Sequence, residues 1–526
     1  MFEIAFFLGI VSYSIFFLGV FHLLYTSILL PFSCIALGLL ILVTRKKIIA
    51  ASISVRNLFK KSAGTKFLLL LIAVQILVNG IGVFGPEISF DALWYHLTLP
   101  KLFLQWHAVE HIPGGLLYYS DMPKLIEMLY VAALSFGNDS LARSIHLALG
   151  VATTISIYFL GRKYLSQKLS LMAAILFYSN LVVGWESVSA YIDLGRAFFE
   201  VLTFYFLIEW EEKTQIKFLF FSSLLLGFAI STKFIAFTSL GIFIPLIVFI
   251  LFLQKKSIGE IVGYCVGFIA IACIIPSPWW IFSYLNTGNF FYPFFSPIYP
   301  TDHLGQLNLL LIFTTLKNTF LFSPDPISPL YAGLLPFVFL IKKWSLKIKL
   351  LAGYTILSLI IWYFSPQTGG GRFLLAYLPV YSVLVVIVYD AFPKGFIKKI
   401  ILFIFFLLAL SSIGYRFLAN AKFIPVILGR ETKQAFLGKE LHFDFGDFAD
   451  IDGYFKTHIK NSDKVLIYGY HNLYYVNFSF VHESWAKKGD SFNYILSNTD
   501  TIPKRFSLFK LVYKNSVTHA YLFSDN

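Results

Sequence analysis

The residues best suited to chemistry lie in one acidic and aromatic run between Pro86 and His96. If this run is helical, Asp91, Trp94 and Tyr95 share a face, because residues three and four positions apart align on a helix. Desolvation beside aromatic rings makes a carboxylate a stronger proton acceptor, which suits a general base for a hydroxyl group. The local pattern leaves one alternative open, an interfacial loop in which Asp91 caps a helix.

The same stretch of chain carries further titratable residues. Asp121 and Lys124 are spaced so that they could pair, orient a metal ion or contact a phosphate. Lys124 could equally extend from an interfacial helix toward water. The histidines His96, His107 and His111 match no metal-binding spacing, so interfacial or solvated roles are favoured for them.

Three more charged residues begin or end apolar segments. Asp193 opens a helix, where capping is the alternative role, and Lys233 ends one, where it would meet a phosphate or extend toward water. Arg372 begins an apolar run, so its charge opposes the helix dipole; an anion such as phosphate suits its forked donors. The glycines before it, Gly369–Gly371, form no nucleotide loop, because no Lys-Ser/Thr follows and no GxGxxG occurs.

Composition identifies the scaffold that must position these residues. The chain has 526 residues, 58% of them hydrophobic and 13% charged, whereas soluble proteins carry about a quarter charged residues. A soluble enzyme, a disordered chain and a disulfide-stapled module are therefore excluded. Cys34, Cys265 and Cys273 lie in apolar runs, so neither disulfides nor a thiolate metal cluster is expected. The net charge of +14 is typical of cytoplasmic loops in a membrane protein, and no nucleic-acid partner is expected.

Apolar runs predict about thirteen membrane spans, since a span needs roughly 17–25 mostly apolar residues and several of these runs are short. The expected spans are Phe6–Tyr25, Leu29–Val43, Phe67–Phe84, Ile145–Leu160, Leu169–Gly184, Arg196–Trp210, Phe218–Ile230, Ile235–Leu253, Val262–Ile275, Leu330–Ile341, Leu350–Tyr363, Leu374–Val388 and Ile400–Ile413. Two further runs, Leu125–Leu134 and Leu309–Phe322, are expected to lie along the membrane surface.

Basic residues predict which way the chain faces. Placing every basic cluster in the cytoplasm lets the spans alternate without contradiction. The clusters include Arg45–Lys47 with Lys60 and Lys61, Arg162 and Lys163, Lys213 and Lys217, Lys255 and Lys256, Lys342–Lys349, and Lys394–Lys399. The N-terminus is then cytoplasmic, and the long loop 85–124 lies outside together with Asp193, Lys233 and Arg372. Residues 419–526 are less apolar and are expected to form a small extracytoplasmic α/β domain.

Several motifs in order resemble the GT-C superfamily of membrane glycosyltransferases. The resemblance is to bacterial glycosyltransferase family 39, which includes protein O-mannosyltransferases and lipid A aminoarabinose transferases. Phe90–Leu97 is similar to the first-loop acidic motif, and Met122–Leu125 stands where a Lys-Pro-Pro-Leu motif is common, with the order changed and one proline missing. The other matching segments are Tyr191–Asp193, Gly227–Lys233, Pro278–Trp280 with Thr287–Pro293, Gly371–Pro379, and the tail from Gly429 through Gly469.

The resemblance implies a fold and an activity. The fold would be an all-α polytopic GT-C-like domain, 1–418, followed by an extracytoplasmic α/β domain, 419–526. The activity would be transfer of a sugar, usually with inversion, from a polyprenyl-phosphate donor to an acceptor lipid, glycan or protein outside the cytoplasm. A transporter or flippase of a lipid-linked glycan is the alternative. The protein would be multi-pass, in a bacterial inner membrane.

The resemblance also implies roles for individual residues. Asp91 and Asp193 would be catalytic, with Asp91 as the base. Arg372, Lys233 and Lys124 would bind the donor phosphate. The acceptor would meet Glu87, Tyr95, His96 and Asp121. A divalent cation at Asp91, Asp121 or Asp193 remains an open alternative.

Overall fold

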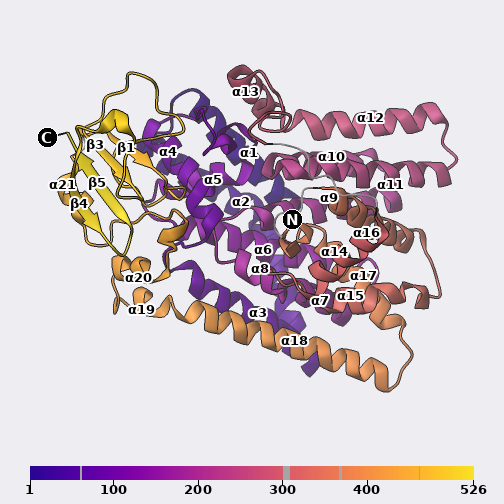
Figure 1. Ribbon diagram of the computed structural model, residues 1–526. Coiled ribbons are helices and arrows are strands. Elements are labelled where there is room, and N and C mark those ends of the chain that lie inside the picture. Colours follow the sequence, from indigo (N-terminus) through magenta and orange to yellow (C-terminus); the bar gives the residue numbers. More distant parts are fainter. Residues whose placement is uncertain (60–61, 300–307, 366–369, 461, 526) are drawn as a thin grey trace.

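A helical body carries a small β-sheet at one end (Figure 1). The computed structural model describes residues 1–59, 62–299, 308–365, 370–460 and 462–525. Lys60, Lys61 and Gly369, which entered the sequence analysis, lie outside the described residues. The expected fold class is confirmed in its coarse form, a largely helical polytopic chain with a C-terminal sheet.

The helical body contains both long and short helices. The helices of eleven or more residues are α1 (Phe2–Val20), α2 (Thr26–Phe59), α3 (Ala63–Val83), α6 (Ser140–Gly161), α7 (Gln167–Tyr178), α9 (Asp193–Lys213), α10 (Ile216–Thr232), α11 (Leu240–Leu253), α12 (Ile258–Ile274), α13 (Ser277–Thr287), α14 (Leu309–Leu321), α16 (Leu346–Phe364), α17 (Leu378–Ala391) and α18 (Phe396–Ala421). The shorter ones are α4 (Thr98–Trp106), α5 (Leu125–Leu134), α8 (Leu181–Glu186), α15 (Leu330–Leu334), α19 (Ile424–Ile427), α20 (Lys433–Glu440) and α21 (Tyr454–His458).

The expected count of thirteen spans is not confirmed. Among the described residues, seven helices are long and apolar enough to cross a membrane, or eight if the bent pair α12 and α13 forms one span. One expected span, Leu169–Gly184, is divided into α7 and α8. Asn180 stands at the break, where its side-chain amide donates to the carbonyls of Leu176 and Phe177. A polar side chain that satisfies local carbonyls in this way competes with helix continuation.

Helix α9 connects the two charged ends of the body. Its 21 residues extend about 30 Å, close to the thickness of a bilayer core. At its C-terminal end, Glu212 pairs with Lys163, at 2.5 Å, and with Lys347. Lys213, in the last turn of α9, also pairs with Glu209. The basic turns at Lys163, Lys213 and Lys347, which the sequence predicts to be cytoplasmic, therefore meet at this end of α9. The N-terminal end of α9 begins with Asp193.

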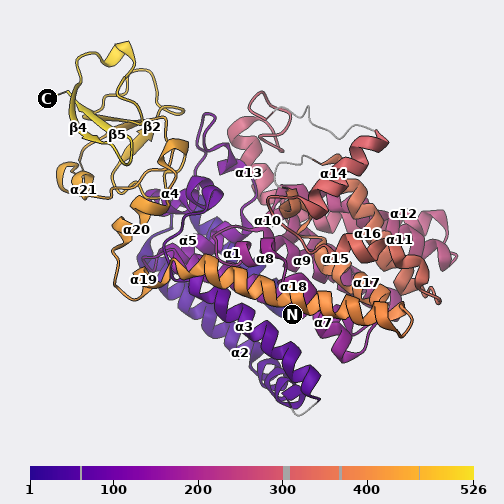
Figure 2. The ribbon, with the colours of Figure 1, turned by 60° about the horizontal axis from the view of Figure 1, so that its bottom comes forward.

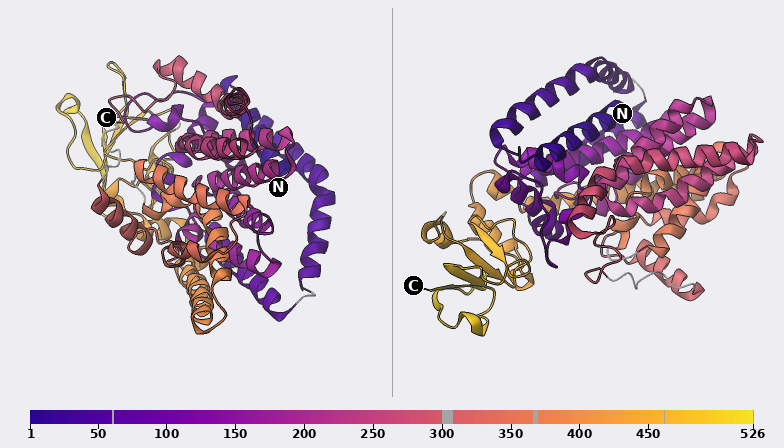
Figure 3. Two further views of the ribbon diagram at one scale, coloured as in Figure 1. Left: turned by 90° about the vertical axis from the view of Figure 1, so that its right-hand side faces the viewer. Right: turned by 90° about the horizontal axis from the view of Figure 1, so that it is seen from above.

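The edge of the body is formed by α2, α3 and α18. Helix α18 packs against α3, and α2 lies outside them, with little of its part Thr26–Arg45 buried (Figures 2 and 3). Helix α18 ends at Ala421, just past the predicted domain boundary at Leu418. The chain then turns through α19 and α20 toward the sheet.

The C-terminal sheet has five strands in the order β2-β1-β3-β5-β4. The strands are β1 (Val465–Tyr468), β2 (Phe480–His482), β3 (Tyr494–Ser497), β4 (Lys510–Asn515) and β5 (Ala520–Ser524). Strand β1 is parallel to β2 and β3, with Leu466 opposite Ile495, and β5 is antiparallel to β3 and β4. The expected strands at Lys464–Tyr468 and Tyr521–Ser524 are confirmed, and the helix expected over Ile451–Ile459 is the shorter α21.

A segment of this C-terminal part docks on the first long loop. The Lys101 ammonium on α4 donates to the carbonyl of Tyr474, at 2.7 Å, and to the carbonyl of Val476. The N–H of Tyr474 donates to the carbonyl of Leu93, at 3.3 Å. Because Leu93 lies two residues after Asp91, this docking fixes the backbone beside the predicted base.

A second set of contacts supports the same junction. The Tyr475 hydroxyl donates to the carbonyl of Glu87, at 2.7 Å. Leu93 and Tyr475 belong to an apolar cluster of buried residues at this junction. Its members are Leu93, Phe423, Phe436, Leu437, Leu441, Phe443, Ala449 and Tyr475.

The docking of this segment should depend on pH through Lys101. Burial, and the nearby charge of Lys433, lower the pKa of Lys101 to about 7 from its ordinary value of 10.5. The docked state therefore binds fewer protons than the undocked chain between pH 7 and 10, so docking strengthens as the pH rises through that window. In detergent-purified protein, the melting temperature of the wild type relative to that of Lys101→Met should rise from pH 7 to pH 9. A difference that stays constant over this range would contradict the assignment.

Candidate active site

Arg372 lies at the centre of a cluster of buried charges. Its guanidinium meets three carboxylates, namely Asp91 at 2.7 Å through Nη1, Glu186 at 3.1 Å through Nε and Asp193 at 3.1 Å through Nη2. The Arg372 side chain is only 11% exposed, and the Glu186 side chain is fully covered. Charges so poorly hydrated persist only when they are paired, so the guanidinium and the carboxylates depend on one another.

A second cation completes the cluster. The Lys233 ammonium pairs with Asp193 at 2.6 Å and lies 5.0 Å from the ring centroid of Phe373. The Arg372 guanidinium lies 4.3 Å from the centroid of Tyr191. Asp193 is thus shared by both cations, while Asp91 contacts Arg372 and has the more exposed side chain, 19% against 5%.

Local backbone structure places Asp91 in this cluster. Asp91 precedes the turn Ala92–His96, and its N–H donates to the Tyr191 hydroxyl at 3.1 Å. This bond ties the first loop to the segment that leads into α9. Asp91 and Asp193 are therefore positioned by the same piece of chain.

The backbone before Arg372 is equally constrained. The N–H of Gly371 donates to the Ser323 hydroxyl at 2.9 Å. A Cβ atom at Gly371 would lie 2.3 Å from the carbonyl oxygen of Asp325. Gly370 has φ of +50°, a conformation that suits glycine. The glycines therefore serve close packing that brings Arg372 to the carboxylates.

The predicted residue Glu87 lies apart from the cluster. It is 1% exposed, and its carboxylate accepts the N–H groups of Ile88, Ser89 and Ala190 at 2.7–2.9 Å. Arg143 lies 3.5 Å from it. These bonds all go to protein groups, so Glu87 fixes the loop, and its role toward an acceptor stays a prediction.

Tyr95 and His96 are buried next to the cluster. Tyr95 stacks on Tyr119 with centroids 3.8 Å apart. His96 Nδ1 lies 2.9 Å from Glu127 Oε1, and burial lowers the pKa of His96. A neutral ring at this position orients Glu127 without adding charge near Asp91.

Asp121 and Lys124 form a separate buried group. Asp121 Oδ2 lies 2.7 Å from His111 Nδ1 and accepts the Ser120 hydroxyl at 2.7 Å. Lys124 is 2% exposed, and burial lowers its pKa to about 8, against the opposing effect of Glu127 and Asp121. The structure thus places Lys124 among carboxylates of the loop, away from Arg372 and Lys233.

The three aspartates open to a divalent cation are not brought together. Asp91 and Asp193 share Arg372, whereas Asp121 pairs with His111. Within the part of the chain that the structure describes, no group of three or more His, Cys, Asp or Glu side chains is arranged to hold a metal ion.

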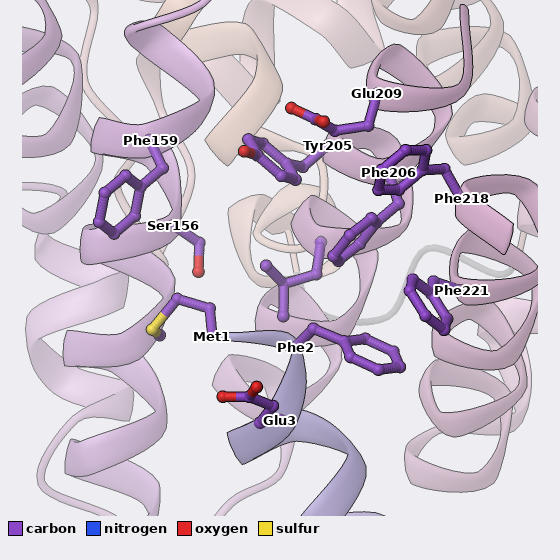
Figure 4. A pocket seen from close by; sticks show the side chains of 11 residues that line it. Met1, Phe2, Glu3, Ser156, Phe159, Tyr205, Phe206, Glu209, Phe218 and Phe221 are labelled. Carbon is purple, nitrogen blue, oxygen red and sulfur yellow. The ribbon is translucent and has the colours of Figure 1, made fainter. Parts of the chain in front are cut away.

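A cavity of about 430 Å³ lies away from the charge cluster (Figure 4). It is bordered by the start of α1 and by α6, α9 and α10, with Glu3 and Glu209 on opposite sides. Glu209 lies in the last turns of α9, and Asp193 is the first residue of that helix. The cavity and the charge cluster are therefore at opposite ends of α9.

Sequence reasoning missed two buried acids. Glu186 lies two residues after the expected span Leu169–Gly184. A single acidic residue between two apolar runs was the signal that could have identified it. Glu200 accepts from Arg196 Nε at 2.7 Å in the interior of α9, and Arg196 also donates to the Tyr377 hydroxyl at 2.8 Å. Charges at membrane depth are costly unless they are paired. Because Tyr377 directly precedes α17, the Arg196–Glu200 pair also links α9 to the start of α17.

Known proteins share the fold of this chain. The sequence profile of a family described as dolichyl-phosphate-mannose-protein mannosyltransferase matches residues 127–280. The fold is similar to that of ArnT from Cupriavidus metallidurans in the apo state, with a TM-score of 0.59, 12% identity, and coverage of 88% of this chain and 99% of that one. The same protein bound to undecaprenyl phosphate gives a TM-score of 0.60 and 13% identity over the same shares.

The chain thus has the fold of ArnT, and its residues 127–280 match the mannosyltransferase family. The expected resemblance is thereby confirmed, together with the multi-pass membrane character of the chain. A comparison with curated protein sequences finds no match. In this fold the charge cluster spans four parts of the chain: the first loop, the segment leading into α9, the end of α10, and the turn before α17.

Removal of Arg372 should destabilise the protein strongly. Arg372→Met leaves three buried carboxylates with Lys233 as the remaining cation of the cluster, and breaking such a pair costs about 3–5 kcal/mol. Denaturant titration in detergent measures the loss of stability. Adding Glu186→Gln should restore part of it, because one uncompensated charge disappears.

The matched control is Arg430→Met, at an exposed arginine in the connection to the sheet. It should shift stability by no more than about 0.5 kcal/mol. Equal losses for Arg372→Met and Arg430→Met would refute the central role of Arg372.

Proposed function

We propose that this protein is a membrane glycosyltransferase that moves a sugar from a polyprenyl-phosphate donor to a hydroxyl of an extracytoplasmic lipid, glycan or protein, with inversion. The observation that carries the proposal is the contact of Arg372 with both Asp91 and Asp193, beside Lys233. A cation pair and a reachable carboxylate in one water-poor site are the groups that such a transfer needs.

The two cations would hold the donor phosphate. Arg372 offers forked donors and Lys233 a point charge, and phosphate oxygens can replace carboxylate oxygens at both. Asp193 would keep the cations in place when the site is empty. The structure of ArnT bound to undecaprenyl phosphate supports a lipid phosphate as the ligand class. Lys124 was also predicted to bind the donor phosphate. From its position near Asp121 and Glu127 it would instead support the first loop.

Asp91 would be the general base. It would take the proton of the acceptor hydroxyl while the oxygen forms a bond to the anomeric carbon. The bond from that carbon to the phosphate oxygen breaks in the same step, and the electron pair leaves with the lipid phosphate. Arg372 and Lys233 stabilise the charge that develops there. Attack opposite the leaving group inverts the anomeric carbon.

Loss of the Asp91 carboxylate should abolish the base. Asp91→Asn should lower kcat for transfer by about 10²–10⁴-fold, measured with purified protein and labelled polyprenyl-phosphate sugar. The matched control is Asp390→Asn, at an aspartate whose side chain is 56% exposed at the end of α17, and it should keep full activity. Wild-type kcat in Asp91→Asn would remove Asp91 as the base.

The active site would face away from the cytoplasm in a bacterial inner membrane. The basic turns at the C-terminal end of α9 would be cytoplasmic, as the bias of Lys and Arg toward that side requires. The N-terminus would lie on the same side as those turns, and residues 419–526 would be extracytoplasmic.

Reporter fusions test this orientation. A fusion after Asn526 should be active as a periplasmic reporter, and a fusion after Lys256, between α11 and α12, should be active as a cytoplasmic one. Both reporters on one side would contradict the proposed orientation.

A further inference from the structure

A group of aromatic rings beside Asp91 is not used by the proposed chemistry. We define the aromatic wall as Phe90, Trp94, Tyr95, Tyr118 and Tyr119. The turn at Phe90–His96 and the turn at Tyr118–Asp121 bring these rings together. Tyr119 contacts Tyr95 at 3.8 Å, Tyr118 at 4.2 Å and Trp94 at 5.3 Å between centroids, and Phe90 contacts Trp94 at 5.8 Å.

The rings are held in fixed orientations. The Trp94 indole N–H donates to the carbonyl of Leu116 at 3.0 Å, and the Tyr118 hydroxyl donates to the Tyr119 hydroxyl at 2.9 Å. A ring anchored at its polar atom presents its apolar face without loss of further rotamer freedom. The wall is thus preorganised before any ligand arrives.

Part of the wall stays accessible. Tyr95 is buried, but Trp94, Tyr118 and Tyr119 are only partly covered, and Phe90 is 44% exposed. In a simple membrane belt, Trp and Tyr direct their polar atoms toward headgroups. Here the Trp94 N–H points to a protein carbonyl and the phenols of Tyr118 and Tyr119 bond to each other, which favours a binding surface over a belt.

The wall adjoins the proposed base. Asp91 directly follows Phe90 in the chain, and its negative charge acts on the phenols of Tyr118 and Tyr119. Burial, together with that charge, raises the pKa of Tyr118. Both phenols therefore stay protonated at neutral pH and can donate as well as accept hydrogen bonds.

These features match a neutral sugar ring. A pyranose has an apolar C–H face that packs on an aromatic ring, and hydroxyls at its rim that pair with phenols. A polyprenyl chain would offer these phenols no hydrogen bond beyond the one that they make with each other.

We propose that the aromatic wall binds a sugar ring of the acceptor and presents one of its hydroxyls to Asp91, so that the acceptor is a saccharide. This inference rests on the proposed function, whose acceptor it narrows from lipid, glycan or protein to a carbohydrate. The donor phosphate would lie at Arg372 and Lys233, and the acceptor sugar at the wall, with Asp91 between them.

Saccharide binding without any donor tests the wall. Saturation-transfer NMR on the full chain in lipid nanodiscs would use methyl hexopyranosides, N-acetylhexosamines and a threonine-containing peptide as probes. We expect saturation of sugar ring C–H protons and none of the peptide. Trp94→Leu and Tyr118→Leu should each weaken saccharide binding about tenfold, the effect of losing one favourable ring contact, while Trp94→Phe should retain most of it.

Two further variants separate this inference from the proposed chemistry. Trp106→Leu, at an exposed tryptophan at the end of α4, should leave saccharide binding unchanged. Asp91→Asn should lose transfer but keep saturation of the sugar ring C–H protons, because the rings carry that binding, so a failure of the base assignment and a failure of the wall give different results. Peptide binding in place of saccharide binding overturns the inference. Saccharide binding unaffected by Trp94→Leu and Tyr118→Leu, in variants that elute as the wild type on gel filtration, overturns it too.

Discussion

The Arg372 guanidinium is the group on which the outer end of the molecule depends. It contacts Asp91, Glu186 and Asp193 within 2.7–3.1 Å in a site that is almost closed to water. Three carboxylates at this separation would repel one another strongly, so without the guanidinium the first loop and the start of α9 could not lie together. Lys233 relieves the remaining charge at Asp193. In the proposed reaction, binding of a donor phosphate would exchange one anion for another at cations that already exist in the fold.

Rigid supports surround this charge cluster on the side of the first loop. The Asp91 N–H is held by Tyr191, and Leu93, in the same turn, is held by the docked segment at Tyr474. Electrostatic catalysis requires dipoles and charges that do not reorganise during the reaction. The C-terminal sheet therefore has a physical reason to pack against this loop, since its docking segment restricts the backbone that carries the proposed base.

Part of this arrangement could be predicted from residue types alone. A charged residue beside an apolar run is costly unless it has a function, and that rule selects Asp91, Asp193, Lys233 and Arg372, which the structure brings together. Their pairing could not be predicted, because Arg372 and Asp91 are 281 positions apart in sequence and local spacing carries no information on such a contact. Glu186 was missed for the same reason. From the sequence alone, Glu186 cannot be distinguished from an acidic residue at the membrane interface, because its contact with Arg372 appears only in the structure.

The helices of the body were likewise predictable in part from the sequence. Apolar periodicity locates the helices of the body, and the matches at α5 and β1 extend to their boundaries within a residue or two. It does not reveal breaks within a run: Leu169–Gly184 has the composition of a span but is interrupted at Asn180, whose side chain bonds to Tyr331 and Ser328 in a distant segment. A single polar residue with tertiary partners thus decides where a helix ends. The aromatic wall follows the same logic, since Trp94 and Tyr118 gain their orientation from partners that the sequence pattern does not reveal.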